Sequence, residues 1–355
     1  MRVHFLTLVR LETAHGMVGW GECTTRAAEA SAATEAIITE GFGPLILGRH
    51  PADVEAIWRA LKRHSYWYGG GGIALIAMSG IDVALWDLQG QIEHVPIYTL
   101  LGGRRAEPVR AAASVLFDMS DIDGTCARFA DYQRRGFTAA KGGYGVSPDA
   151  HFGQDGDRDL TLLREIRATV GDRMDIAADV SVHASWTLPH ALKMGRRFEE
   201  FALFWLEDPL PHDNRVGYRR LRGSVTTPVA TGERLWTLDD YRVLLDADAA
   251  DIILIDPGRV GGITAMKRIA DYAATQGVGV VPHSWFSALN TAAALHVFAT
   301  LDNGVVFEIK PDPFPMQHEL IFNPFAQVDG WLAVPDQPGL GINMNEAAVT
   351  RYTAR

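Results

Sequence analysis

The chain has 355 residues, of which 47% are hydrophobic, and it carries a formal net charge of −10 at pH 7. This length exceeds one ordinary domain and fits a barrel of about 250 residues with a smaller companion domain. The negative charge argues against nucleic acid and against an anionic membrane surface as partners, because binding to either needs clustered Lys and Arg. An anionic small molecule remains possible where a local positive charge, such as a metal ion, meets it.

Cysteine content and the N-terminal residues indicate the expected compartment. The two cysteines, Cys23 and Cys126, cannot form a disulfide framework or a cysteine-type zinc site alone, and free thiols suit a reducing compartment. The N-terminus lacks the basic segment, apolar run and small-residue cleavage site of a signal peptide. No apolar run approaches the roughly 18 residues of a transmembrane helix. We therefore expect a cytoplasmic protein with no membrane partner.

The first residues predict an antiparallel hairpin. Residues Phe5–Thr13 alternate between apolar and polar, His15–Gly16 forms a turn, and Met17–Cys23 returns. Helical spacing follows in Ala27–Leu47 and in Pro51–Leu61, where we place Pro51 in a first helical turn.

A glycine-rich loop and a buried helix complete the first domain. Ser65–Gly72 reads SYWYGGGG, which has neither the Lys-Ser/Thr ending of a P-loop nor the context of a dinucleotide fingerprint, so a mobile loop is expected. Ala74–Gln91 is apolar on nearly every side and predicts a buried helix. The turn-rich segment Leu100–Pro108 is a candidate domain boundary.

Charged residues then recur at the ends of short apolar runs, at intervals that settle near 25 residues, about one strand plus one helix. In chain order they are Lys141, Asp179, Glu207, Glu233, Asp256, His283 and Glu308. A repeat of strand, polar end and helix builds a parallel sheet, and eight such units close a (β/α)8 barrel whose strand ends converge on one mouth. An open doubly wound sheet is the rival architecture, but its strand ends do not all point to one place.

Eight barrel strands are predicted from Val109 onward. They are Val109–Val115, Ala139–Gly145, Met174–Ser181, Leu203–Glu207, Pro228–Glu233, Asp251–Asp256, Val278–Ser284 and Val305–Ile309. The segments between them, such as Leu160–Val170 and Ala265–Gln276, have the spacing of amphipathic helices. The turn-rich segment Gly330–Ile342 is expected to run back to the first domain.

Three carboxylates at successive strand ends predict a metal site. Asp179, Glu207 and Glu233 offer hard oxygen ligands with no Cys and no paired His, a set that favours Mg²⁺, or Mn²⁺ in its place, over zinc. Asp208 follows Glu207, and one of this pair must face away because strand side chains alternate. Periodicity alone does not say which of the two faces the mouth.

The remaining polar strand ends suit acid–base chemistry. A hydrogen bond between Asp256 and His283 would fix the imidazole tautomer and raise its basicity, which makes His283 a candidate general base. Lys141, on the opposite side of the barrel, could bind a carboxylate, stabilise an oxyanion or act as a base, and Glu308 could donate to a developing negative oxygen if protonated. His296, within a helix, is expected to be structural. A divalent cation, a base and nearby donors suit removal of the proton α to a carboxylate.

Motifs over nearly the whole chain carry a family resemblance. They are GWGE (Gly19–Glu22), SGIDVALWDLQG (Ser79–Gly90), GFTAAK (Gly136–Lys141), WLEDP (Trp205–Pro209), TGE (Thr231–Glu233), DPGRVGG (Asp256–Gly262), PHS (Pro282–Ser284), FE (Phe307–Glu308) and PGLG (Pro338–Gly341). With these motifs the chain resembles the mandelate racemase subgroup of the enolase superfamily.

The resemblance implies a fold and roles for the site residues. The expected fold is a modified (β/α)7β TIM barrel, of the α/β class, with an α+β capping domain formed from the N-terminal region and the C-terminal segment. It implies Mg²⁺ held by Asp179, Glu207 and Glu233, which selects Glu207 over Asp208. It also implies an Asp256–His283 dyad, Glu308 as a partner of a substrate oxygen, and cap loops near Cys23–Arg26 and Ser65–Gly72 that close over the substrate. The expected divisions are residues 1–106, 107–326 and 327–355.

Two features depart from the family pattern. The second barrel strand carries Lys-x-Lys in the family, but here it reads Lys141-Gly142-Gly143, so the second lysine is missing. Racemisation by two bases is therefore in doubt, whereas elimination by one base is still equipped. Relatives also carry one more strand before Phe5, so Met1 could be a shortened start, with a less ordered cap edge near Cys23.

The sequence thus predicts a Mg²⁺-dependent dehydratase that removes water from a sugar acid to give a 2-keto-3-deoxy acid. An epimerase, racemase or cycloisomerase, with Lys141 as a second base, is the enzyme alternative, and a non-catalytic sugar-acid-binding relative is the alternative from another class. A homo-oligomer is the default for a soluble enzyme. The candidate substrate contacts are Arg26, Trp67, Tyr144 and Trp285, with Tyr66, Tyr68 and His183 as further candidates that could equally be packing or solvated side chains.

Overall fold

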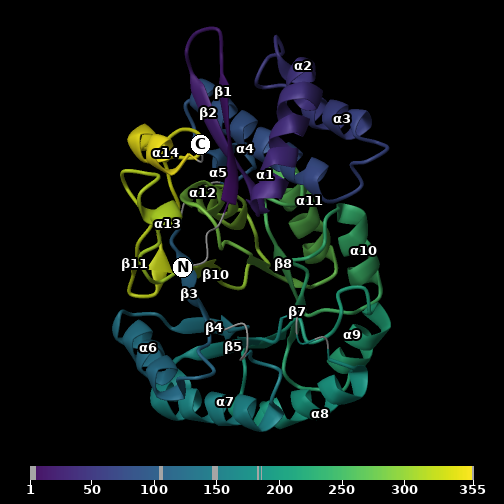
Figure 1. The fold of residues 1–355 in the computed structure, drawn as a ribbon, viewed down its shortest axis with the longest axis vertical. Helices are drawn as coiled ribbons and strands as arrows, with labels where there is room; N and C mark the ends of the chain where they lie inside the picture. The colour runs from purple at the N-terminus through teal and green to yellow at the C-terminus, as the bar shows by residue number, and fades with distance from the viewer. Residues whose placement is uncertain (1–4, 104–106, 146–150, 182–183, 185, 354–355) are drawn as a thin grey trace.

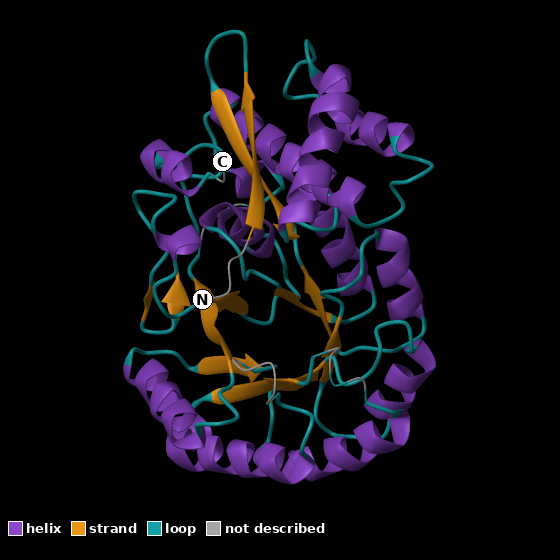
Figure 2. Ribbon diagram, viewed as in Figure 1, coloured by secondary structure: helices purple, strands orange, loops and turns teal. Residues whose placement is uncertain are grey.

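The computed structural model describes residues 5–103, 107–145, 151–181, 184 and 186–353. A capping domain of one hairpin and several helices lies above a ring of strands surrounded by helices (Figures 1 and 2). The C-terminal segment runs along one side of both parts. The expected α/β barrel with an α+β cap is confirmed, whereas the expectation about Met1 falls outside the described residues.

The cap is built on a hairpin that packs closely against one helix. Strands β1 (Phe5–Glu12) and β2 (Val18–Arg26) pair antiparallel, as predicted, and helix α4 (Ile73–Ile92) packs against β2. A Cβ atom at Gly21 would lie 2.9 Å from the carbonyl carbon of Gly80 in α4, so both backbones come together at a position that only glycine permits. Close packing of β2 against α4 therefore explains the glycine at position 21 of the GWGE motif.

The other cap helices differ in detail from the prediction. Residues 28–46 are helical, but α1 (Ala28–Ala36) passes through a π-helical segment, η1 (Ile37–Phe42), before the short α2 (Gly43–Ile46). Helix α3 is Val54–His64. The placement of Pro51 in a first helical turn is wrong, because Pro51 lies in the turn that precedes the helix.

Helix α4 also corrects the expectation that no segment reaches transmembrane length. Its 20 residues are long and apolar enough to span a membrane by length and composition alone, but 83% of its most apolar window is buried inside the protein. The predicted buried helix is therefore confirmed. Its apolar character is explained by contacts with β2 on one side and with the barrel helix α11 on another.

Eight parallel strands form the barrel. They are β3 (Val109–Leu116), β4 (Ala139–Gly143), β5 (Asp175–Asp179), β6 (Trp205–Glu207), β7 (Val229–Thr231), β8 (Ile252–Ile255), β9 (Gly279–Pro282) and β10 (Phe307–Ile309). Neighbours in this order pair in parallel from β3 to β9, and β10 pairs with β3. A parallel bridge between Val280 and Gly304 joins β9 to the residues before β10 and completes the ring. The predicted strands are confirmed in number and order, and most are shorter than predicted.

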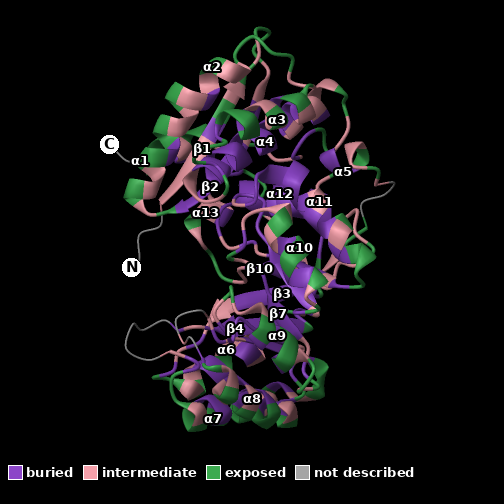
Figure 3. Ribbon diagram, turned by 90° about the vertical axis from the view of Figure 1, so that its right-hand side faces the viewer, coloured by how far each residue is buried: buried purple, intermediate pink, exposed green. Residues whose placement is uncertain are grey.

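The helices between the strands form the outer layer, whose inward faces are buried (Figure 3). They are α6 (Ile122–Arg134), α7 (Gly156–Val170), α8 (Leu188–Phe198), α9 (Arg215–Arg222), α10 (Leu238–Asp246), α11 (Gly262–Thr275) and α12 (Ala288–Phe298), with short 3-10 turns η2 (Gly171–Arg173) and η3 (Glu199–Phe201). In the part of the chain that the structure describes, seven helices lie between eight strands, which matches the predicted (β/α)7β order.

The C-terminal segment contacts both the barrel and the cap. It contains α13 (Pro315–His318), β11 (Gln327–Val328), β12 (Trp331–Leu332) and α14 (Glu346–Tyr352), and β12 pairs antiparallel with β3. Further on, Gly339 bridges to Pro96 beside α5 (Ile97–Leu100), and the Leu340 amide donates to Asp87 of α4 at 2.9 Å. The division of the chain at residues 106 and 326 stays a proposal, and residues 104–106 of the predicted boundary lie outside the described part.

Candidate active site

Strand alternation brings the predicted site residues to one end of the barrel. Six of them stand two positions after a residue of the apolar layer inside the barrel, so both side chains of each pair point toward the barrel axis. In this way Lys141 follows Ala139, Asp179 follows Ala177, Glu207 follows Trp205, Asp256 follows Leu254, His283 follows Val281 and Glu308 follows Val306. Lys141, Asp179, Glu233 and His283 line a cavity of about 130 Å³ at this mouth.

Lys141 lies at the centre of the carboxylates. Its ammonium is 2.9 Å from Glu207 Oε1 and 4.0 Å from Asp179 Oδ2. It is also 2.9 Å from Glu308 Oε1, close enough for an ion pair although not aligned for a hydrogen bond. Burial would lower the pKa of Lys141, but the surrounding carboxylates, foremost Glu207 and Glu308, outweigh it and raise the pKa well above its ordinary value. These carboxylates favour the charged form of the lysine, which suits binding of an anion.

The predicted metal triad spans three neighbouring strand ends. Asp179 and Glu207 are direct neighbours in the register of β5 and β6, and Glu233 follows β7. Burial, and then the neighbouring carboxylates, raise the pKa of Asp179 and raise that of Glu207 to about 7. Burial would raise the pKa of Glu233 as well, but the charges of His283, Lys141 and Arg26 outweigh it and lower that pKa. Asp179 and Glu207, which repel each other, form a site that a divalent cation would stabilise.

The triad side chains have other partners in the structure. Glu207 accepts from Lys141 and from the Trp205 indole at 2.8 Å, and Glu233 Oε2 lies 3.4 Å from His283 Nε2. Within the described ranges, no three Asp, Glu, His or Cys side chains already enclose the position of an ion. The donor types and strand register fit Mg²⁺, and the carboxylates would have to turn from these partners to hold it.

Asp208 is directed away from the mouth. It has a positive φ of 43°, accepts from Thr231 Oγ1 at 2.5 Å and from the Tyr218 hydroxyl at 3.5 Å, and is buried. Burial raises its pKa to about 8. The structure therefore places Glu207 inward and Asp208 between strand and helix. Periodicity alone had not decided which of the two faces the mouth.

Asp256 and His283 are hydrogen-bonded. Asp256 Oδ2 lies 2.9 Å from His283 Nδ1, so the other imidazole nitrogen, Nε2, faces the mouth. Burial alone would lower the pKa of His283, but the bond to Asp256 and the charge of Glu233 raise it above its ordinary value. This orientation suits an imidazole that exchanges a proton through Nε2.

Two residues that orient the dyad were missed from the sequence. The Asn290 side-chain amide donates to Asp256 Oδ1 at 2.7 Å, and the Gly258 amide donates to the same oxygen at 2.8 Å. Asn290 lies one turn into α12, and its neighbour Ser287, the N-cap, donates to the buried Glu22 of the cap. The GWGE and DPGRVGG motifs contained two of these four residues, but no spacing in the sequence indicated that they would meet.

A second network joins Glu308 to the mouth. Ser114 of β3 donates to Glu308 Oε2 at 3.2 Å and accepts from the Trp285 indole at 2.7 Å. Ser114 was also missed, although it occupies the inward register of β3, two residues after Ala112. Trp285 lines the cavity, so this network connects Glu308 with a predicted substrate contact.

The structure gives a reason for the missing second lysine. A Cβ atom at Gly143 would lie 2.5 Å from the backbone oxygen of Asp179, on the neighbouring strand. Any side chain at this position would therefore displace the backbone that carries a predicted metal ligand. The sequence noted the absence, but only the packing of β4 against β5 explains it.

The predicted substrate contacts are only partly brought together. Arg26, Tyr144 and Trp285 line the cavity, and the Tyr144 ring stacks on His151 at 4.3 Å. Trp67 does not line it: its side chain is 91% exposed and meets Tyr66 edge-on. Its loop still lies near the mouth, because Gly71 packs against Trp236, three residues after Glu233. His183 falls outside the described residues.

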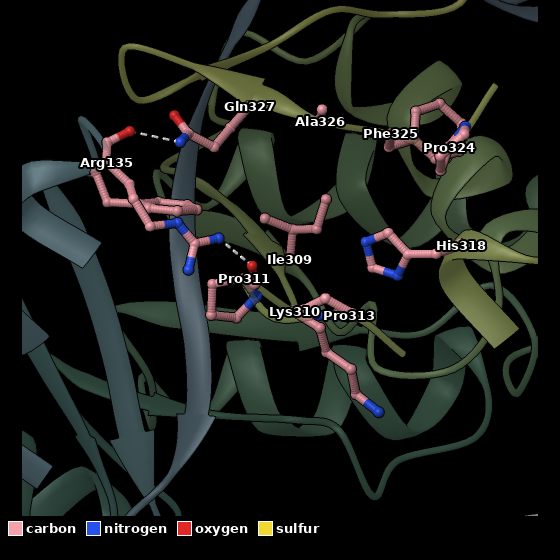
Figure 4. A pocket seen from close by; sticks show the side chains of 11 residues that line it. Arg135, Ile309, Lys310, Pro311, Pro313, His318, Pro324, Phe325, Ala326 and Gln327 are labelled. Atoms are coloured by element: carbon pink, nitrogen blue, oxygen red, sulfur yellow. Dashed lines mark hydrogen bonds between the residues drawn. The ribbon is translucent and has the colours of Figure 1, made fainter. Parts of the chain in front are cut away.

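A larger cavity lies elsewhere. Its volume is about 460 Å³, and it is bounded by the end of α6 and by the chain that follows β10, including Arg135, Ile309, His318 and Phe325 (Figure 4). No carboxylate occurs among the described residues that line it. The smaller cavity at the strand ends is therefore the candidate active site, because the ionisable groups converge there.

Comparisons with known proteins agree with this geometry. Residues 1–102 match the mandelate racemase / muconate lactonizing enzyme N-terminal domain, and residues 125–348 match the family described as enolase C-terminal domain-like. The chain is 32% identical to a D-galactarolactone cycloisomerase of Agrobacterium fabrum, covering 97% of this chain and 90% of that protein. It is 29% identical to a D-mannonate dehydratase of Caulobacter vibrioides, covering 98% and 91%.

A solved structure extends the comparison. A racemase from Streptomyces coelicolor with bound magnesium superimposes with a TM-score of 0.86 at 25% identity, over 98% of this chain and 92% of that one. Fold, strand-end residues and sequence matches over both domains thus agree, and the chain belongs to the mandelate racemase group of the enolase superfamily.

Proposed function

We propose that the protein is a Mg²⁺-dependent dehydratase of a sugar acid, which removes the proton α to the carboxylate and eliminates the β-hydroxyl to give a 2-keto-3-deoxy acid. The observation that carries the choice of elimination is the single base. In the described lining of the cavity, His283 is the one imidazole, Lys141 is paired with Glu207 and Glu308, and Gly143 has no side chain.

Each proposed role follows from a contact. Asp179, Glu207 and Glu233 would hold Mg²⁺, which when bound supplies positive charge that stabilises negative charge developing on the substrate carboxylate. Lys141, charged and buried, pairs with the same end of the substrate. Glu308, held by Ser114, faces a substrate oxygen.

The dyad carries the proton. Asp256 holds His283 through Nδ1, and His283 takes the α-proton at Nε2. The resulting imidazolium then donates that proton to the departing β-hydroxyl, which leaves as water as the carbon–oxygen bond breaks. The enol product rearranges to the 2-keto acid. One histidine thus acts first as base and then as acid, so no second base is needed.

The test is a library of sugar acids screened for 2-keto acid formation, with solvent deuterium incorporation at the α-carbon of recovered substrate as a second readout. Asp179→Asn and His283→Asn should each abolish both signals. Retained turnover in both variants would refute the proposal. Tight binding without turnover or exchange on any acid would instead indicate a non-catalytic sugar-acid-binding relative.

Cycloisomerisation is the second candidate, because the 32% identical relative is a cycloisomerase. It would use the same dyad and metal ligands on a sugar-acid lactone. Mass spectrometry separates the two reactions, since a dehydratase product has lost water and a cycloisomerase product has the mass of its substrate. A cytoplasmic location and a homo-oligomeric state remain predictions.

A further inference from the structure

Lys310 is a half-buried cation that the proposed reaction does not use. It stands two positions after Glu308 and directly follows β10. Its ammonium lies 3.4 Å from the centre of the Phe314 ring and 4.3 Å from the centre of the Trp285 ring. Lys310 is among the residues that line the larger cavity, and in Figure 4 its side chain extends away from Ile309 and His318. Because Trp285 lines the active-site cavity, the ammonium lies beside that cavity.

Arg26 adds a second cation at the same edge. It ends β2 of the cap with a positive φ of 64°, lines the active-site cavity, and lies 6.0 Å from the centre of the Phe286 ring. Among the described residues, neither Arg26 nor Lys310 has a carboxylate oxygen within 4.0 Å. Burial, and then the charge of Arg26, lower the pKa of Lys310 to about 8, which agrees with two neighbouring cations that lack a counter-ion.

Glu22 is the acidic group whose charge acts on Lys310, and Glu233, a proposed metal ligand, is the one on which the charge of Arg26 acts. Glu22 Oε2 accepts from the backbone and hydroxyl of Ser287, and burial raises the pKa of Glu22 to about 7, so it carries only part of a negative charge near neutral pH. The half-buried Lys310 ammonium is costly without a full counter-charge unless an anion completes the site, and Arg26, which is exposed, lies beside it as a second cation.

Trp285 separates this pair from the other cation of the cavity. Its indole donates to Ser114, which bonds Glu308 and thereby reaches Lys141, whereas its ring face contacts Lys310. The Trp285 indole N–H is therefore linked through Ser114 and Glu308 to the Lys141 ammonium, and its ring face contacts the Lys310 ammonium. A ligand that satisfies both ends would carry two negative charges.

We propose that Arg26 and Lys310 bind a second carboxylate of the substrate, at the end remote from the metal triad, and that the substrate is a dicarboxylic sugar acid. This inference rests on the proposed function, because the first carboxylate is the one at Lys141 and the triad. The guanidinium and ammonium donate charge-assisted hydrogen bonds to the distal carboxylate, and a sugar acid with a terminal hydroxymethyl group leaves both cations unpaired.

The experiment compares six-carbon aldaric acids with the aldonic acids of the same hydroxyl configuration, over the full set of configurations. For each pair, kcat/KM is measured by 2-keto acid formation. The wild-type protein should prefer the diacid by about tenfold or more in its best pair. Lys310→Met and Arg26→Gln should each reduce that preference by about tenfold, mainly through KM, whereas Lys310→Arg should retain it.

Lys62→Met is the matched control, because Lys62 also lies over an indole, that of Trp58, 5.3 Å from the ring centre but in the cap helix α3. It should leave the preference unchanged. Turnover that favours the monoacid, or a diacid preference equal to wild type in both Lys310→Met and Arg26→Gln, overturns the inference while the proposed dehydratase stands. Absence of turnover and of deuterium exchange with every pair overturns both.

Discussion

Gly143 lies where the family pattern has a lysine, and Gly143→Ala tests why it is glycine. The new Cβ atom would be 2.5 Å from the Asp179 backbone oxygen, whereas carbon and oxygen atoms that touch across strands are about 3.3 Å apart. Strand β5 would therefore have to move by about 0.8 Å at the residue that we propose as a metal ligand. The substitution should thus affect the metal site as well as the stability.

The magnitudes follow from overpacking in a rigid sheet. Such insertions cost about 1–3 kcal/mol. With an unfolding entropy of about 2.1 cal/mol/K per residue, this corresponds to a fall in Tm of about 1–4 °C for a chain of this length. Displacing a ligand's support lowers metal affinity by about tenfold or more.

The assay measures thermal unfolding and the Mg²⁺ concentration that gives half-maximal turnover. Gly223→Ala is the control, because Gly223 has a helical φ of −75° and a Cβ there would meet its nearest neighbour, the Arg219 oxygen, at an ordinary 3.5 Å. An unchanged Tm and an unchanged Mg²⁺ dependence in Gly143→Ala would refute the steric explanation. So would Gly143→Lys if it were as stable as wild type and exchanged the α-proton from both faces.

Three further predictions concern the dyad, the cap and the metal. Asn290→Leu should lower kcat about tenfold with little change in KM, because Asp256 loses a donor that orients it, and an unchanged kcat would contradict this. Burial raises the pKa of Glu22 from 4.5 to about 7, so the unfolded chain releases a proton that the folded protein keeps, and stability falls as the pH rises through this window. Glu22→Gln should therefore gain up to about 3 kcal/mol in unfolding free energy relative to wild type between about pH 5 and about pH 8. If urea titrations give the same difference between the two proteins at every pH, the raised pKa of Glu22 is excluded. Chelation with EDTA should abolish turnover until Mg²⁺ or Mn²⁺ is added back, and full activity after chelation would exclude a metal-dependent reaction.

The barrel and the positions of its inward residues could be predicted from the sequence. The recurrence of polar strand ends fixes the number of strands, and the period of two within each strand determines which residues face the axis. This is why Lys141, Asp179, Glu207, Asp256 and His283 were expected at one mouth, and the structure places them there. Both signals are local, since each needs only a few neighbouring residues and the repeat between them.

Contacts between distant segments were decided by the tertiary structure alone. Asn290 meets Asp256, Ser114 meets Glu308, and Lys310 comes to lie over Trp285 only because the strands close into a ring and the loops fold over it. The pKa of Lys141 follows the same rule: its sequence neighbours are glycine and alanine, and the carboxylates that raise its pKa come from other strands. Sequence periodicity predicts the direction in which a side chain points. Its burial and its charge state depend on the remote groups that surround it, and only the packing of the chain determines which groups those are.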